Sequence, residues 1–394
     1  MVRPGRPLLA LVAFALVISA QVAGDSKRRS ADTEAVAAFL KRHWRHPISP
    51  QGPPPPGFSA LEASLAPESC GTCHPAQHSD WKTSLHARSM GPGVTGQLAE
   101  MWQTDAESAR LCLTCHAPLA EQQPENRTLF DARLHRQGLV CAACHVRQHE
   151  RFGPPRRQAA SETARPPAAL PHRGATRTAA FHVSEFCASC HQFEDDGFAL
   201  NGKLLENTYA EWKASPAARQ GLQCQDCHMP DRRHLWRGIH DPETVRAGVV
   251  ITLATDQPRY RTGQEVGARL TITSTAVGHH FPTYVTPRVV VRAALVDTAG
   301  REISGSADER VIAREVTLDL SRELFDTRIP AGSRFTFDYR RRLDRGGLRL
   351  RVVVTVLPDH FYTRFFESRL RDGAGRGTPE IRAALEATRR SAFE

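Results

Sequence analysis

Residues 70–74 read Cys-Gly-Thr-Cys-His, and this unit of two cysteines, two residues apart and followed at once by histidine, occurs five times in the chain. The copies lie at 70–74, 112–116, 141–145, 187–191 and 224–228. Together they use all ten cysteines of the 394-residue sequence. A repeat that consumes every cysteine and adds a histidine each time decides the class of protein.

The C-x-x-C-H unit has a direct chemical explanation, which is covalent attachment of haem c. The two thiols form thioethers with the haem vinyl groups, and the following imidazole is a good axial ligand for iron. The sequence therefore predicts five covalently attached haem c groups. The predicted attachment residues are Cys70, Cys73, Cys112, Cys115, Cys141, Cys144, Cys187, Cys190, Cys224 and Cys227. The predicted proximal ligands are His74, His116, His145, His191 and His228.

Three other uses of paired cysteines explain the pattern less well. A disulfide framework suits an exported protein but leaves five adjacent histidines unexplained. Zinc knuckles come in pairs, and five cannot pair evenly. A redox C-x-x-C is expected once in a chain rather than five times.

The N-terminus and the charge indicate where the protein works. Arg3 and Arg6 precede an uncharged apolar run at 8–20, which predicts a signal peptide over residues 1–24 and an exported, periplasmic or extracellular protein. A retained N-terminal membrane anchor is the alternative. The net charge of +10 does not indicate nucleic-acid binding, because the arginines are scattered and haem propionates offset much of that charge.

The rest of the chain divides by composition. Residues 25–69 contain a short helix at 31–44 and a Pro-rich linker, and residues 70–246 hold the five motifs between short polar segments. Porphyrin faces would supply much of the core of this loop-rich, mainly α domain. An exposed loop is expected at 153–177, where Pro, Ala and Arg dominate.

Residues 247–372 change character, because cysteines vanish and period-2 patterns begin. We expect an antiparallel β-sandwich of immunoglobulin-like plan, followed by a helical tail at 373–394. The strand candidates are 249–253, 268–273, 289–296, 335–339 and 348–357, and the helix of the tail is expected at 379–391.

Sequence around the motifs resembles the cytochrome c-554/c-prime superfamily of multihaem cytochromes. The first motif is followed by Trp81-Lys-Thr-Ser-Leu-His86, a W-x-x-S-x-H tail typical of that group. The segments at 186–230 and 232–243 are similar to the same superfamily, and 278–283 (GHHFPT) is similar to a segment of related proteins with an appended β domain. Tetrahaem members lack a fifth haem and this β domain, so their haem arrangement does not transfer directly.

Distal ligands come from the thirteen histidines outside the motifs. The resemblance implies His86, since the histidine of the W-x-x-S-x-H tail usually ligates a different haem. Five further candidates are His172, His234, His240, His149 and His279, with His135 and His182 in reserve. Six favoured histidines for five irons mean that one binds no iron, or that one iron takes none.

Two functions remain open. Bis-histidine haems favour electron transfer between closely spaced irons, with redox proteins or a membrane quinol oxidoreductase as partners. A homo-oligomer or filament is a variant of this reading. The alternative is a redox enzyme in which one haem keeps an open position for a small nitrogen or sulfur compound. The β-sandwich is then either a docking module or a lid over the terminal haem.

Overall fold

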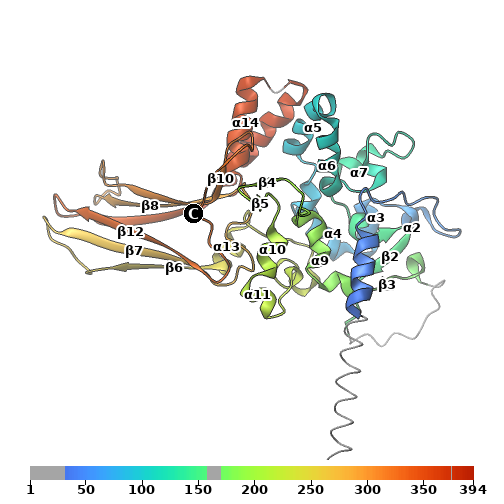
Figure 1. Ribbon diagram of the computed structural model, residues 1–394, viewed down its shortest axis with the longest axis horizontal. Helices are drawn as coiled ribbons and strands as arrows, with labels where there is room; N and C mark the ends of the chain where they lie inside the picture. Colours follow the sequence, from blue (N-terminus) through green and yellow to red (C-terminus); the bar gives the residue numbers. More distant parts are fainter. Residues whose placement is uncertain (1–31, 158–169, 374) are drawn as a thin grey trace, which may run out of the picture.

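The computed structural model describes residues 32–157, 170–373 and 375–394, as a helical body from which a β-rich arm extends (Figure 1). The predicted fold class, a loop-rich and mainly helical domain followed by an antiparallel β-sandwich, is confirmed. The predicted signal peptide at 1–24 and the middle of the loop expected at 153–177 lie outside the described residues. Within the described ranges, no helix is both long and apolar enough to cross a bilayer.

The helical body is built from short elements. A helix over residues 32–43 matches the one expected at 31–44. The α-helices that follow are α2 (Ala60–Ala63), α3 (Pro67–Cys73), α4 (Pro75–Thr83), α5 (Pro92–Thr104), α6 (Ala106–His116), α7 (Ala132–Arg136), α8 (Cys141–His145), α9 (Glu185–His191), α10 (Thr208–Lys213), α11 (Pro216–Arg219), α12 (Cys224–His228) and α13 (Pro242–Gly248). Short strands β1 (Val146–Arg147), β2 (Glu150–Gly153), β3 (Thr176–Arg177), β4 (Ala199–Leu200) and β5 (Lys203–Leu204) connect them.

Local sequence explains where these helices begin. Proline stands in the first turn of α3, α4, α5, α11 and α13, where its missing N–H costs nothing. Asp105 caps α6 by accepting a hydrogen bond from the backbone N–H of Ser108 at 3.1 Å. Helix α6 therefore starts at a fixed residue and ends on its motif histidine.

The arm is a sandwich of two three-stranded antiparallel sheets, ordered β12–β7–β6 and β13–β8–β9. Their bounds are β6 (Val249–Thr255), β7 (Glu265–Ser274), β8 (Arg288–Val296), β9 (Asp308–Ile312), β12 (Arg334–Arg342) and β13 (Arg349–Leu357). Every strand predicted from alternation is present. Ala268, Leu270 and Ile272 alternate inward along β7 and pack against β8 residues such as Val291 in a common core. The hairpin of β10 (Arg314–Val316) and β11 (Glu323–Asp326) lies between arm and body.

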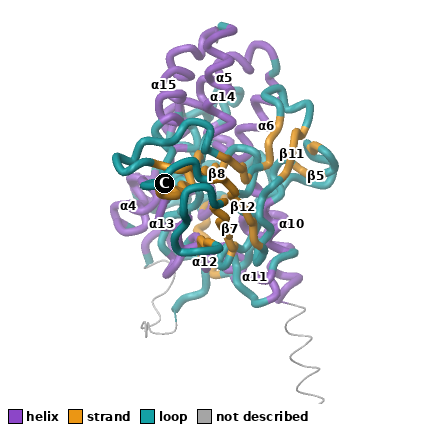
Figure 2. Tube along the Cα trace, turned by 90° about the vertical axis from the view of Figure 1, so that its left-hand side faces the viewer, coloured by secondary structure: helices purple, strands orange, loops and turns teal. Residues whose placement is uncertain are grey.

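Two C-terminal helices, α14 (His360–Asp372) and α15 (Thr378–Arg389), return to the body and pack against α5 (Figures 1 and 2). The tail helix expected at 379–391 is confirmed as α15, whereas α14 falls inside the range assigned to the sandwich, whose last strand ends at Leu357. Close approach depends on glycine, because a Cβ on Gly377 would lie 2.0 Å from the carbonyl oxygen of Gly96. The chain end is thereby fixed to the motif-bearing domain.

Candidate functional site

Each C-x-x-C-H motif forms one helical turn. Four motifs lie wholly within α6, α8, α9 and α12, and the first spans the end of α3, with His74 as its C-cap. Residues i, i+3 and i+4 of a helix share one face, so both thiols and the imidazole of a motif lie on the same side. The ten cysteines, all within the described residues, form no disulfide with one another.

Neighbouring motifs lie close together in a definite order. Helix α3 packs against α8, and α6 packs against α9. The sulfur atoms interact in the pairs Cys70 with Cys141, Cys115 with Cys190, and Cys187 with Cys224. Because Cys144 also lies near Cys187 and Cys190, the third motif adjoins the fourth. The fourth motif therefore neighbours the second, third and fifth.

Four of the five motif histidines are oriented through Nδ1. Three of them contact backbone carbonyl oxygens and one contacts a side-chain hydroxyl, at 2.6–2.8 Å: His116 to Ser89, His145 to Phe152, His228 to Arg237, and His191 to the hydroxyl of Tyr284. A neutral imidazole that donates through Nδ1–H leaves the Nε2 lone pair free for a metal. This is the outer hydrogen bond that metal-binding histidines ordinarily make.

Three motif histidines face a second histidine at a nearly constant spacing. Ring centroids are 6.3 Å apart for His191 and His86, 6.2 Å for His145 and His234, and 6.3 Å for His228 and His279. With metal–nitrogen bonds of about 2 Å, two imidazoles on opposite sides of one metal place their centroids roughly 6 Å apart. The described residues therefore fit haem iron between each pair.

Burial keeps these rings neutral, which is the form that binds a metal. Burial, aided by neighbouring histidines, lowers the pKa of His86 to about 3. Burial likewise lowers the pKa of His145 and of His191 to about 4. Protonated imidazolium is thus absent from these positions near neutral pH.

His172 lies near the first motif. Burial is the main cause of the lowered pKa of His74, and the nearby charge of His172 lowers that pKa further. Its Nδ1 lies 2.8 Å from the carbonyl oxygen of Gly174, and its backbone N–H donates to Glu62 at 2.6 Å. His172 therefore has the same orientation through Nδ1 as His234 and His279, whose Nδ1 atoms also contact backbone carbonyl oxygens.

In two other sequence-predicted ligands, Nε2 faces another group of the protein instead of a motif. His149 places Nε2 3.0 Å from the carbonyl oxygen of Gly52, and His240 places Nε2 3.0 Å from Asp359. Neither ring contacts a motif histidine among the described aromatic contacts. Of the reserves, His135 contacts the carbonyl oxygen of Gln122 through Nδ1, and His182 contacts Arg232.

The second motif is different. His116 is half-buried and contacts Ser89, but among the described residues no histidine ring lies against it. A carboxyl and a phenol lie near this motif, since Glu206 interacts with Cys115 and Tyr362 interacts with Cys112. Burial raises the pKa of Glu206 to about 8 and that of Tyr362 to about 12.

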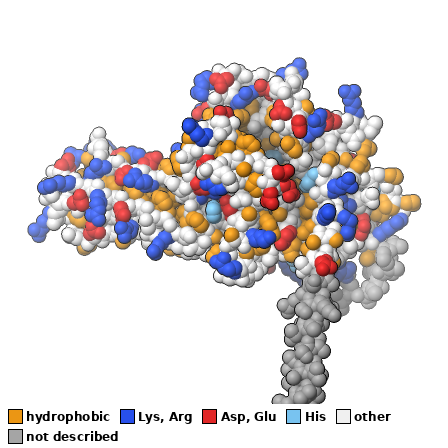
Figure 3. All heavy atoms as spheres, viewed as in Figure 1, with side chains coloured by type: hydrophobic (Ala, Val, Ile, Leu, Met, Phe, Trp, Pro, Cys, Tyr) orange, Lys and Arg blue, Asp and Glu red, His pale blue; other side chains and the backbone are white. Residues whose placement is uncertain are grey.

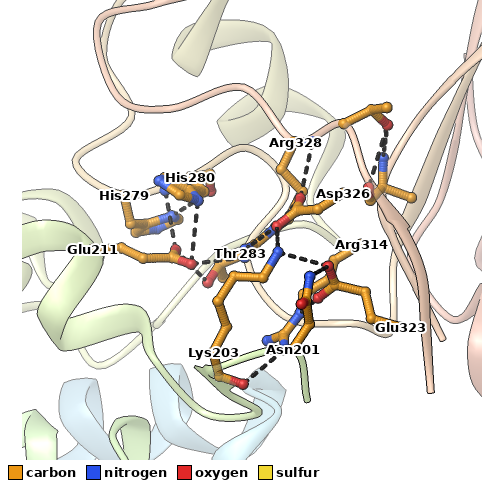
Figure 4. A network of polar contacts seen from close by, with 12 residues as sticks. Asn201, Lys203, Glu211, His279, His280, Thr283, Arg314, Glu323, Asp326 and Arg328 are labelled. Atoms are coloured by element: carbon orange, nitrogen blue, oxygen red, sulfur yellow. Dashed lines mark hydrogen bonds and ion pairs between the residues drawn. The ribbon is translucent and has the colours of Figure 1, made fainter. Parts of the chain in front are cut away.

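The loop at 278–284 connects the β arm to the motifs, and sequence reasoning found only part of it. His279 faces His228, while Tyr284 contacts His191. Glu211 on α10 holds this loop by accepting from the N–H of His280 at 3.2 Å and the hydroxyl of Thr283 at 3.1 Å (Figure 4). Only the GHHFPT resemblance had marked the segment.

Buried ion pairs extend this contact between arm and body (Figure 4). Arg328 and Glu211 pair at 2.7 Å with side chains only 3 % exposed. Arg314, also buried, pairs with Glu323 at 2.9 Å and donates to the carbonyl oxygens of Leu200 and Leu204. On the outer surface, by contrast, charges of both signs alternate along the arm (Figure 3).

Comparison with known proteins agrees with this geometry. No curated protein matches the chain. The fold is similar to a penta-heme cytochrome c552 from Thermochromatium tepidum, with a TM-score of 0.57 and 18 % identity over 76 % of this chain and 92 % of that one. A structural genomics target, SoR45, and the alkylpurine DNA glycosylase AlkC of Pseudomonas fluorescens reach TM-scores of only 0.17 and 0.16, at 10 % and 18 % identity. They cover 28 % of this chain each, and 73 % and 28 % of their own, and carry no argument.

The family model described as cytochrome c554 and c-prime matches residues 69–146, which contain the first three motifs. This match supports haem-based electron transfer in general, and the structural likeness shows a shared fold. The predicted resemblance is therefore confirmed: residues 69–146 are similar to cytochrome c554 and c-prime, and the fold is similar to that of a penta-heme cytochrome c552.

Proposed function

We propose that the chain is an exported, periplasmic or extracellular cytochrome that carries five haem c groups and transfers electrons between redox partners. The observation that supports this proposal most strongly is the repeated distance of 6.2–6.3 Å between the ring centroids of a motif histidine and a second histidine. When bound, haem supplies the iron that is oxidised and reduced. The residues of the chain fix where each iron sits and which ligands it has.

Three bis-histidine sites follow from the ring contacts, and the charge effect of His172 on His74 supports a fourth. We assign His172 opposite His74, His234 opposite His145, His86 opposite His191, and His279 opposite His228. His149 and His240 are left out of this assignment because their Nε2 atoms face Gly52 and Asp359. The distal histidine thus precedes its motif in the fourth site and follows it in the first, third and fifth sites.

The motif order supports transfer rather than isolated sites. The first motif adjoins the third, and the fourth adjoins the second, third and fifth. The fourth site is therefore the common neighbour of three others. We expect redox proteins or a membrane quinol oxidoreductase as partners, and a homo-oligomer or filament as a variant.

A second candidate function rests on His116. If no side chain takes the opposite position there, a small nitrogen or sulfur compound could bind, with the buried Glu206 and Tyr362 as nearby proton-carrying groups. The other four sites would then supply or remove electrons. This second candidate function uses the same four pairs of histidine ligands as the electron-transfer proposal.

Spectroscopy of the mature protein tests both proposals. Electron paramagnetic resonance of the oxidised form should show low-spin signals for the bis-histidine sites. Carbon monoxide added to the reduced form reports any open iron. A response of one site in five favours the enzyme, and no response favours the carrier. High-spin signals from three or more sites would contradict the bis-histidine assignment.

A further inference from the structure

His191 of the fourth motif differs from its counterparts in the acceptor that it faces. His116, His145 and His228 contact backbone carbonyl oxygens, whereas the Nδ1 of His191 lies 2.6 Å from the hydroxyl oxygen of Tyr284. A backbone carbonyl only accepts hydrogen bonds, whereas a phenolic oxygen that accepts from Nδ1–H can also donate its own hydrogen to a further acceptor. The outer partner of the fourth site is therefore itself positioned by its neighbours.

Bonding at Tyr284 has a fixed direction once His191 binds a metal through Nε2. Nδ1 then carries the proton and donates it to the phenolic oxygen. The hydroxyl hydrogen of Tyr284 is free to donate in turn, and Glu206 and Thr208 lie near this hydroxyl as its candidate acceptors.

The backbone shows that Tyr284 is held in place. Its φ is +67°, in the left-handed region that bulky residues avoid. Such a conformation persists only where surrounding contacts determine it. Those contacts are present, because Thr283 bonds both Glu211 and Thr208, and Phe281 pairs with Ile329 through the backbone in both directions.

We propose that Tyr284 is a positioning residue through which the β arm sets the redox potential of the fourth haem. This inference rests on the proposed function, since it requires haem at Cys187 and Cys190. A hydrogen bond from Nδ1–H raises the basicity of a ligating imidazole, and a more basic ligand favours oxidised iron. Loss of the acceptor should therefore raise the potential.

The test is Tyr284→Phe in the mature, haem-loaded chain. We expect an unchanged haem content, an upward shift of one midpoint in a potentiometric titration, and altered g-values of one low-spin signal. The matched control is Tyr209→Phe, which removes a hydroxyl that donates to Glu185 on the same motif helix without touching His191. The control should leave all midpoints unchanged. Unchanged midpoints and g-values in Tyr284→Phe would overturn the inference.

A second variant covers loss of haem or misfolding in Tyr284→Phe. Glu206→Gln keeps the hydroxyl but weakens its acceptor, and at pH 9 the carboxyl is ionised although burial raises its pKa to about 8. The same midpoint should move upward, and a fixed midpoint would again overturn the inference. Failure of the proposed function is distinguishable, because the unmodified chain would then lack covalent haem.

Discussion

His279 of the β arm faces His228 of the fifth motif, with ring centroids 6.3 Å apart and ring planes within 6°. The two residues are separated by the first two strands of the sandwich, yet they meet as the ligands of one iron would. On the proposed assignment, the arm is part of the haem-binding structure rather than an appendage to it. It would contribute a ligand to the fifth site and a hydrogen-bond partner to the fourth.

Removal of the distal ligand tests this role. In His279→Ala, one of the five haems should change from low-spin to high-spin and bind carbon monoxide when reduced, because its iron loses one axial ligand. The adjacent His280→Ala is the control, since His280 pairs with Glu211 instead of facing a motif histidine. Identical spectra for both variants would argue against the assignment of His279.

The buried ion pair between arm and body should be costly to break. Arg328→Met leaves Glu211 charged and without its partner in a site that is 3 % exposed, so we expect a loss of about 3–5 kcal/mol in unfolding free energy. The control, Arg269→Met, breaks a pair with Asp338 whose side chains are 62 % and 50 % exposed. It should cost far less, because exposed ion pairs contribute little to stability. Urea titrations of the haem-loaded chains measure both, and equal losses would contradict the burial argument.

Glu315 predicts a pH dependence of stability. Burial alone would raise its pKa, but His360 and Arg288 outweigh burial and lower the pKa from 4.5 to about 2. A depressed folded-state pKa contributes stability that is present above the unfolded value and is lost as pH falls through the folded value. Glu315→Gln should therefore be less stable than the unmodified chain by roughly 1–2 kcal/mol above pH 5.

The difference between the two chains should shrink between pH 4.5 and about 2, where Glu315 becomes protonated in the folded state. Unfolding by urea at several pH values measures this difference. Glu386→Gln, at an exposed position of α15, is the control and should show no such trend. A difference that stays constant down to pH 2.5 would contradict the ion-pair explanation.

Gly377 should be needed for the contact between α15 and α5. In Gly377→Ala the new Cβ would meet the carbonyl oxygen of Gly96 at 2.0 Å, so the helices must separate, at a cost of about 1–3 kcal/mol. Hydrogen exchange of α15 amides should become faster. Gly238→Ala is the control, because no atom lies within 4 Å of its added Cβ. Equal protection of α15 in both variants would show that close packing is not required.

Sequence patterns predicted those features that depend on near neighbours. Alternation of Ala268, Leu270 and Ile272 predicted β7 because successive side chains of a strand point to opposite faces. The motifs predicted their own helical turns in the same way, through a fixed spacing of cysteine and histidine. Helix α14 was missed, although Phe361, Phe365 and Phe366 recur at helical spacing, because the segment follows directly on strand β13.

Features that depend on distant partners could not be predicted. Glu211 and Arg328 lie 117 positions apart, and nothing local marks either as buried. Tyr284 lies in no recognised sequence motif, because its contact with His191 depends on the packing of the arm against α9. Candidate distal histidines were named from the chain, but their pairing depends on tertiary structure, as the Nε2 contacts of His149 and His240 illustrate.

The central claim is that all five C-x-x-C-H motifs carry covalently attached haem. A pyridine haemochrome assay on the purified, mature protein tests it most directly, with protein concentration measured independently. The account predicts five haems per chain and a strong Soret band that survives acidic organic extraction. Markedly fewer than five haems, or a colourless protein, would contradict it.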